Sequence, residues 1–373
     1  MKSIVISGSG LFTPEHTISN EELVNAYNQY VDLFNQQNQQ AIAAEELAAL
    51  PYSSSAFIEK ASGIKSRHVM YKDTILDPHI MMPQIDKCGP DDTPEMVTMA
   101  LAAAKEALAQ AGRHAHEVDL IICAASNSQR PYPALAIELQ HLLGAQGYAY
   151  DMNVACSSAT FAIINASNAI QTGNAKVALV VNPEFASPQL NYKSRDSHFI
   201  FGDVCTATII EAEQDCNPGN AFRILGTKQK TQFSNNIRCA VNYTDHCAGN
   251  IPDDNPYFTQ EGRKVFKELL PIVAKLILSH LEEMHLSATD LKRLWLHQAN
   301  INMNVFAAKK ILAKEEVDEL EAPLVLDEYG NTASAGSIIA FHLYKADFTP
   351  GDKGILCSFG AGYSVGCIGL EKL

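Results

Sequence analysis

The sequence predicts an α/β fold of packed layers, for three reasons. Strand-like and helix-like segments alternate along the chain, which is typical of sheets whose strands are joined by helices. Several predicted helices end at a glycine, the residue most often found just past a helix C-terminus. The second half of the chain repeats the order of elements in the first. We therefore expect largely parallel strands in two related halves, residues 1–190 and 191–373.

In the first half, an apolar strand at 4–11 precedes a helix that starts at a capping box, Ser19 with Glu22. A second helix is predicted at 41–50. The remaining segments alternate between apolar runs of strand length and longer helical patterns. They are a helix at 93–112, a strand at 119–125, a helix at 134–143, a strand at 149–155, a helix at 157–172 and a strand at 175–182.

The same alternation continues in the second half. Its predicted elements are a strand at 222–226, a helix at 262–281, a strand at 291–296, helices at 302–313 and 334–346, and strands at 354–359 and 364–370. The two halves agree in the order of their elements and not residue by residue, so the predicted duplication rests on architecture.

Composition narrows the possible functions. The chain has 28 basic and 42 acidic residues, and its net charge of −14 argues against nucleic-acid binding. No segment is typical of a membrane span or of a signal peptide, so we expect a cytoplasmic protein without membrane attachment. The nine cysteines show no CxxC spacing, which predicts reduced thiols and no metal site.

Three polar side chains stand where predicted strands give way to loops or helices: Cys156, His297 and Asn331. Cys156 begins a helix rich in small residues, and the positive end of the helix dipole is expected to lower the thiol pKa and favour a nucleophilic thiolate. Each residue also has a plainer interpretation, as a structural cysteine, a loop histidine or a helix-capping asparagine. Open α/β folds place ligands at the carboxyl ends of their strands, where these residues are predicted to lie.

A glycine-rich turn follows the first of the two C-terminal strands, at residues 358–363. It could be a simple hairpin, or it could bring a backbone N–H close to a substrate carbonyl as an oxyanion donor. The turn lacks the spacing of GxGxxG or Walker motifs, which argues against a role in binding nucleotide phosphates.

Taken together, these segments resemble the thiolase superfamily, and within it the 3-oxoacyl-(acyl carrier protein) synthase III branch. The resemblance runs over nearly the whole chain, and the Cys-His-Asn order separates it from elongating synthases with Cys-His-His. The motifs that carry it are Asn153-Val-Ala-Cys156-Ser157, Ile200-Phe201-Gly202-Asp203, Glu261-Gly262-Arg263-Lys264-Val265-Phe266-Lys267, His297-Gln298-Ala299-Asn300, Gly330-Asn331-Thr332 and Phe359-Gly360-Ala361-Gly362.

The resemblance implies a duplicated fold with the layers α-β-α-β-α and mixed five-stranded sheets, a homodimer and no cofactor. It implies that Cys156 accepts an acyl group from acyl-CoA and that malonyl-acyl carrier protein then loses CO₂ and attacks it, in fatty acid biosynthesis. His297 and Asn331 would donate hydrogen bonds to the enolate, and the backbone amides of Cys156 and Ala361 would form the oxyanion hole.

The resemblance assigns roles to further residues. Asn300 and Phe201 would support the site, and Asn300 would do so by hydrogen bonding. Substrate-binding positions are Phe57, Tyr132, Gly360 and Gly362, with Tyr132 reaching the acyl pocket of the dimer partner. Lys309 and Lys310 would dock the acyl carrier protein, although such a pair is equally typical of a solvated helix face.

Four departures from the family pattern bear on the substrate. A helical insert at about residues 21–52 lengthens the chain. Phe57 and Ala61 replace a Trp and an Arg that clamp the CoA adenine, so a guanidinium is expected to be missing. Asn302 replaces a basic residue. Ala361 replaces a glycine and would resist a positive φ. We expect a medium or long acyl primer, for example octanoyl.

Other functions remain open. The chain could be a thiolase-fold acyltransferase, or a starter synthase of secondary metabolism that takes no part in fatty-acid elongation. It could also be a catalytically silent acyl-CoA-binding protein, although the presence of all three polar residues argues against that.

Overall fold

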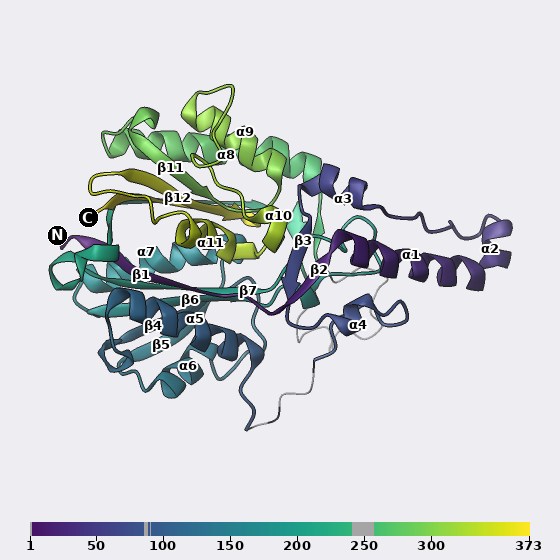
Figure 1. The fold of residues 1–373 in the computed structure, drawn as a ribbon, viewed down its shortest axis with the longest axis horizontal. Coiled ribbons are helices and arrows are strands. Elements are labelled where there is room, and N and C mark those ends of the chain that lie inside the picture. Colours follow the sequence, from purple (N-terminus) through teal and green to yellow (C-terminus); the bar gives the residue numbers. More distant parts are fainter. Residues whose placement is uncertain (1, 86–88, 90, 241–256) are drawn as a thin grey trace.

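The computed structural model describes residues 2–85, 89, 91–240 and 257–373, which form the five-layer α-β-α-β-α arrangement predicted from the sequence (Figure 1). One pair of helices covers each outer face, and a third pair lies between the two layers of strands. The outer pairs are α5 (Glu95–Ala111) with α6 (Leu135–Leu143) and α8 (Gly262–Glu283) with α9 (Ile301–Leu312). The central pair is α7 (Ser158–Gln171) with α11 (Gly336–Leu343).

Nine strands of the described chain are hydrogen-bonded in the order β11-β12-β13-β8-β1-β7-β6-β4-β5. β1 and β8 share only two residue pairs, Val5 with Arg223 and Ile6 with Phe222, so the strands fall into two layers. The first layer holds five strands: β1 (Ile4–Phe12), β7 (Val204–Ala212), β6 (Val177–Glu184), β4 (Leu120–Ala124) and β5 (Tyr148–Met152). The second holds four: β8 (Phe222–Ser234), β13 (Gly362–Lys372), β12 (Lys353–Gly360) and β11 (Leu291–Leu296).

The mixed character predicted through the resemblance is present, but the expectation of largely parallel strands is wrong. Parallel pairing is confined to β4 with its two neighbours and to β11 with β12, and the other pairs of this sheet are antiparallel. β12 and β13 form a hairpin, which makes antiparallel pairing the natural result. β7, which the sequence analysis does not predict, runs antiparallel to both β1 and β6. The division at residue 190 stays a prediction.

Most predicted elements occur with shifted ends, and the helix predicted at 41–50 is wrong. Only α2 (Gln39–Ala43) is helical in that part of the chain. The strand expected at 149–155 stops at Met152, and the strand expected at 222–226 continues to Ser234. The smaller elements are β2 (His16–Ser19) paired with β3 (Ser66–Val69), β9 (Ile237–Arg238) paired with β10 (Thr259–Gln260), α3 (Ser55–Ser62), α4 (Asp73–Leu76) and α10 (Leu326–Tyr329).

The N-terminal insert forms an arm that projects from the layered body (Figure 1). α1 (Asn20–Gln37) starts at the predicted capping box, in which Ser19 and Glu22 bond to each other's backbone. Two asparagines on α1 then hold the returning chain. Asn28 bonds to both backbone groups of Ser53, and Asn35 does the same to Leu50. The bonds to Leu50 satisfy the end of the segment predicted as a helix, 41–50, and those to Ser53 satisfy the chain that follows it.

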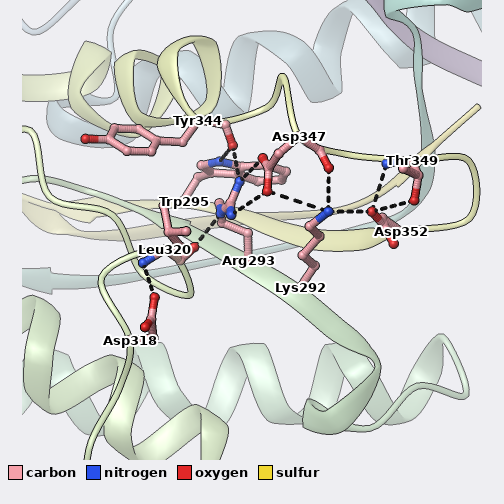
Figure 2. Close-up of polar contacts among 9 residues, drawn as sticks. All are labelled: Lys292, Arg293, Trp295, Asp318, Leu320, Tyr344, Asp347, Thr349 and Asp352. Atoms are coloured by element: carbon pink, nitrogen blue, oxygen red, sulfur yellow. Dashed lines mark hydrogen bonds and ion pairs between the residues drawn. The ribbon is translucent and has the colours of Figure 1, made fainter.

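A buried arginine anchors the start of β11, the strand that ends immediately before His297 (Figure 2). The Arg293 side chain is only 2% exposed and bonds to both carboxylate oxygens of Asp347, at 2.6 and 3.1 Å. It also donates to the carbonyls of Tyr344 and Leu320. Arg293 therefore ties two loops to the beginning of β11 and fixes the direction of this strand.

None of the described helices combines the length and apolar character that a membrane crossing requires.

We predict that Arg293→Ala lowers the free energy of unfolding by about 3 kcal/mol, because it removes a buried, fully bonded cation. Urea denaturation measures the change. The matched control is Lys65→Ala, which breaks an ion pair to Asp327 whose side chains are 67% and 47% exposed and should cost under about 0.5 kcal/mol. Equal losses in the two variants would contradict this account.

Candidate active site

Cys156 lies in a short 3-10 turn, Ala155–Ser157, that connects β5 to α7. The turn is held in an uncommon shape, because Ala155 has a φ of 46°, in the left-handed region. Both the oxygen and the nitrogen of the Asn153 side-chain amide hold this turn in place by hydrogen bonds. Its Oδ1 accepts from the Ala155 N–H at 2.7 Å, and its Nδ2 donates to the carbonyl of Ser126 at 3.0 Å.

The end of β12 packs directly on this turn. A Cβ at Gly360 would lie 2.8 Å from Cys156 Sγ, so no larger residue fits there. Ser364 joins the following hairpin to the turn, because its Oγ bonds to Ser157 Oγ at 2.9 Å. The backbones of Ala361 and Cys156 both hydrogen-bond to the sulfur. Positive φ occurs at Gly362, at 127°, and not at Ala361, so the expected strain at Ala361 is absent.

His297 follows β11 and is 2% exposed. Its backbone N–H donates to the carbonyl of Cys357 on β12 at 2.9 Å, and its ring meets the Phe359 ring edge-to-face, with centroids 5.3 Å apart. Burial lowers the pKa of His297 to about 4, and a hydrogen bond with the backbone of Ala333 opposes the shift. The imidazole is therefore neutral at physiological pH, with one N–H and one lone pair.

Asn331 is buried and joined by its backbone to the segment around Phe201. Its N–H donates to the carbonyl of Ile200 at 2.9 Å, and its carbonyl accepts from Gly202 at 3.3 Å. Its side-chain Oδ1 accepts from the Ala333 N–H at 3.0 Å. Among the described residues nothing accepts a hydrogen bond from Nδ2, so this amide group is available as a donor.

Cys156, His297 and Asn331 thus gather around the end of β12. Phe359 contacts the His297 ring, Gly360 touches Cys156, and Ala333 links His297 to Asn331. The two halves contribute similar turns, since Ala333 also has a φ of 46° and opens a 3-10 turn, Ala333–Ala335, before α11.

The state of the Cys156 thiol differs from the one predicted. Burial, and to a lesser extent the nearby Glu184 carboxylate, raise the pKa of Cys156 to about 12 against the opposing effect of two backbone hydrogen bonds. The expectation of a thiolate stabilised by the helix N-terminus is therefore wrong, because burial and a buried acid outweigh the dipole. At neutral pH the site holds a neutral thiol beside a neutral imidazole.

Two functional candidates were missed by the sequence analysis. Glu184 ends β6 with no exposed surface, and a carboxylate closing an apolar strand is the signal that could have found it. Arg195 places its guanidinium 3.7 Å from the centroid of the Phe57 ring and donates from Nε to the carbonyl of Tyr52 at 2.8 Å. The guanidinium expected to be missing beside Phe57 is thus supplied by another segment of the chain.

Asn300 and Phe201 take structural positions next to the site. Asn300 caps α9 through a bond from Asn302 N–H at 2.9 Å, and its Nδ2 donates to the carbonyl of Ala61 at the end of α3 at 2.6 Å. The buried ring of Phe201 meets Phe258 edge-to-face, with centroids 4.6 Å apart.

Three predicted residues are not joined to the Cys156 turn by any interaction within the described chain. Tyr132 is 81% exposed, in the loop before α6. Lys309 and Lys310 lie on the surface of the last turn of α9. Lys309 lines a surface groove of about 1110 Å³.

Comparison with family models and curated proteins gives consistent matches. Residues 150–232 match the model of 3-oxoacyl-[acyl-carrier-protein] synthase III, and residues 281–372 match the model of its C-terminal domain. The beta-ketodecanoyl-[acyl-carrier-protein] synthase of Pseudomonas aeruginosa is 51% identical over 350 residues, covering 94% of this chain and 100% of that protein. The beta-ketoacyl-[acyl-carrier-protein] synthase III of Bradyrhizobium diazoefficiens is 30% identical over 88% of this chain and 93% of its own length.

Solved structures confirm the predicted fold class. The 3-oxoacyl-[acyl-carrier-protein] synthase III of Aquifex aeolicus superposes with a TM-score of 0.75 at 24% identity, covering 99% of both chains. FabH, the 3-oxoacyl-(acyl carrier protein) synthase III of Pseudomonas aeruginosa, gives a TM-score of 0.75 at 23% identity, covering 99% of this chain and 98% of that one.

We predict that alkylation of Cys156 by iodoacetamide accelerates about tenfold per pH unit from pH 7 to 10, because a thiol with a pKa of about 12 stays largely protonated over this range. Mass spectrometry of the Cys156 peptide measures the rate. The same peptide in the urea-unfolded chain is the control and should level off above roughly pH 8.5. A plateau below pH 8 in the folded protein would restore the thiolate interpretation.

Proposed function

The chain belongs to the 3-oxoacyl-[acyl-carrier-protein] synthase III family, and we propose that it condenses a medium-chain acyl-CoA primer with malonyl-acyl carrier protein through an acyl-Cys156 intermediate. This family carries out decarboxylative condensation of acyl-CoA with malonyl-acyl carrier protein in fatty acid biosynthesis. The observation that carries the proposal is the placement of Cys156, His297 and Asn331 around the end of β12.

The proposed primer has eight carbons. A beta-ketodecanoyl product has ten carbons, and a condensation that adds two carbons makes it from an octanoyl primer. The chain is 51% identical to the Pseudomonas aeruginosa protein named for that product, over 94% of this chain. This similarity supports octanoyl as the primer.

Loading begins when Cys156 Sγ attacks the carbonyl carbon of the acyl-CoA thioester. The thiol proton must leave as the sulfur–carbon bond forms, because a thiol with a pKa of about 12 is not ionised at neutral pH. The neutral imidazole of His297 can take this proton and return it to the departing CoA sulfur. The products are acyl-Cys156 and CoA with a free thiol.

Condensation uses the same site and needs no second nucleophilic side chain from the protein. Malonyl-acyl carrier protein loses CO₂, and the electron pair remains as a thioester enolate. Its oxygen accepts from Asn331 Nδ2 and from the His297 N–H, which exchanges the Ala333 carbonyl for the enolate oxygen. The enolate carbon attacks acyl-Cys156, and the N–H groups of Cys156 and Ala361 hold the oxyanion that forms. Each such donor contributes about 3–4 kcal/mol. Release of the Cys156 sulfur, which takes up one proton, leaves 3-oxoacyl-acyl carrier protein.

The Phe57–Arg195 stack is the proposed contact for the adenine of CoA. The guanidinium already lies against the Phe57 ring, 3.7 Å from its centroid, so a purine would stack on an outer face of this pair. The arm supports this contact. Tyr52, whose carbonyl holds Arg195, lies in the returning segment that Asn28 and Asn35 fasten to α1.

The remaining assignments belong to the same proposal. Lys309 and Lys310 dock the acyl carrier protein by their positive charge, and Asn300 keeps α9 in place beside α3. A homodimer is favoured by the exposed Tyr132 and by β5, an edge strand with exposed tyrosines at 148 and 150. Two related halves divided near residue 190, and a cytoplasmic location, complete the proposal.

We predict that, in a series of acyl-CoAs from acetyl to long-chain, octanoyl-CoA adds its acyl mass to Cys156 fastest. Mass spectrometry of the intact protein measures loading, and Cys156→Ala is the control that should remain unmodified. Malonyl-acyl carrier protein is then added, and release of CO₂ is measured. Loading without CO₂ release would support a non-condensing acyltransferase, loading by acetyl-CoA alone would refute the medium-chain primer, and no loading would support a silent binding protein.

We further predict that Arg195→Ala raises the KM for octanoyl-CoA about tenfold and leaves kcat within about twofold, because it removes one stacking surface. The matched control is a different substrate, the N-acetylcysteamine thioester of octanoate, which lacks the adenine and should react equally with parent and variant. A comparable loss with both substrates would rule out an adenine contact.

A further inference from the structure

Glu184 is a buried carboxylate for which the proposed chemistry has no use. It is the last residue of β6 and has no exposed surface. In the described part of the chain it forms no ion pair with a basic side chain. A buried acid without a cation is costly unless hydrogen bonds compensate it, so its partners should indicate why it is there.

One set of partners leads to Cys156. The carboxylate accepts from the Ser126 N–H at 3.1 Å and from Ser126 Oγ at 2.6 Å. The Ser126 carbonyl in turn accepts from Asn153, whose Oδ1 holds the N–H of Ala155. Glu184 is thus linked through two residues to the strained turn that carries the thiol.

The other set leads to the enolate donors. Glu184 Oε1 accepts from the Ser334 N–H at 3.1 Å and from Ser334 Oγ at 2.5 Å. Ser334 follows Ala333, whose N–H fixes the amide of Asn331 and whose backbone also bonds to His297. Ser334 occupies the middle of its 3-10 turn, the place that Cys156 has in the turn of the first half.

We infer that Glu184 is a positioning residue for the condensation: its carboxylate ties the turn of Cys156 to the turn that orients Asn331 and His297. The inference rests on the proposed function. Glu184 touches no substrate and acts through Ser126 and Ser334. Without the carboxylate, the Cys156 turn would still contact the end of β12 but would lose its hydrogen-bonded link to the turn that orients Asn331. The two turns could then drift by fractions of an ångström, which is enough to slow a reaction of this kind.

Because Glu184 carries a charge beside Cys156, the inference can be tested by the reactivity of the thiol, which a purely structural residue would not change. Among the residues that the structure describes, the titratable groups that face it are three thiols, Cys156, Cys123 on β4 and Cys205 on β7. His297, on the other side of the site, is neutral. A carboxylate beside Cys156 opposes formation of the thiolate, so removing its charge should make the thiol easier to ionise.

The test compares the parent enzyme with Glu184→Gln, which keeps the shape but removes the charge and one acceptor. We expect kcat for condensation to fall at least tenfold while the KM for octanoyl-CoA changes less than threefold. Alkylation of Cys156 by iodoacetamide should become roughly threefold faster or more at pH 8. Ser334→Ala and Ser126→Ala each remove one donor and should cause smaller falls in kcat.

Glu211→Gln is the matched control. Glu211 is also fully buried, but it pairs with Val177 at the opposite end of β6 and bonds to Ser7 and Arg113. It should lower the melting temperature without changing Cys156 alkylation, and should leave kcat per folded molecule within about twofold. Similar effects of the Glu184 and Glu211 variants on alkylation would overturn the inference.

Two further outcomes decide the inference. A Glu184→Gln enzyme with kcat within twofold of the parent refutes it. If that variant does not fold, Ser334→Ala replaces it, and unchanged kcat there refutes the inference equally. If the parent itself releases no CO₂ from malonyl-acyl carrier protein, the proposed function fails, while loading of Cys156 and its alkylation rates still test whether Glu184 positions the thiol.

Discussion

The site depends on the contact between the end of β12 and the Cys156 turn. Gly360 approaches Cys156 so closely that a Cβ would lie 2.5 Å from the Cys156 Cβ, so the two layers of strands meet here without an intervening side chain. The same end of β12 carries Phe359, which packs on the His297 ring, and leads to Ala361, whose backbone bonds to the thiol. One strand end therefore sets the position of the nucleophile relative to the histidine, and the buried Arg293 fastens the start of neighbouring β11 to the loop that leads into β12.

The neutrality of the site follows from the same close packing. Burial raises the pKa of Cys156 to about 12 and lowers that of His297 to about 4, so neither residue is charged near pH 7. In the proposed reaction this suits decarboxylation. An imidazolium would stabilise the carboxylate of the malonyl group, whereas a neutral N–H and the amide of Asn331 favour the enolate oxygen, where charge develops only as CO₂ leaves.

The features that the sequence predicted correctly are those that depend on residues close together in the chain. The capping box at Ser19, the helix-ending glycines at 112 and 144 and the position of His297 after a strand could all be read directly, because each depends on a short stretch of chain. The thiol pKa could not be predicted in this way, because the burial of Cys156 and its proximity to Glu184 both result from tertiary contacts. Arg195 was missed because a distant segment supplies it, and the helix at 41–50 was overpredicted because Asn35 bonds to its backbone from another helix.

The arm is coupled to the candidate active site through a shared apolar cluster. The arm holds Tyr52, and through it Arg195 and Phe57, on the outer side where CoA is proposed to bind. Phe201, by contrast, is 4% exposed, packs on Phe258 and pairs by its backbone with Asn331. A longer N-terminal segment can therefore change how tightly CoA is held. Because α1 and Phe201 pack in one buried apolar cluster, with Phe57 against it, changes in the arm also reach the segment that pairs with Asn331. The effects of mutations in the arm and at Phe201 are therefore expected to be non-additive.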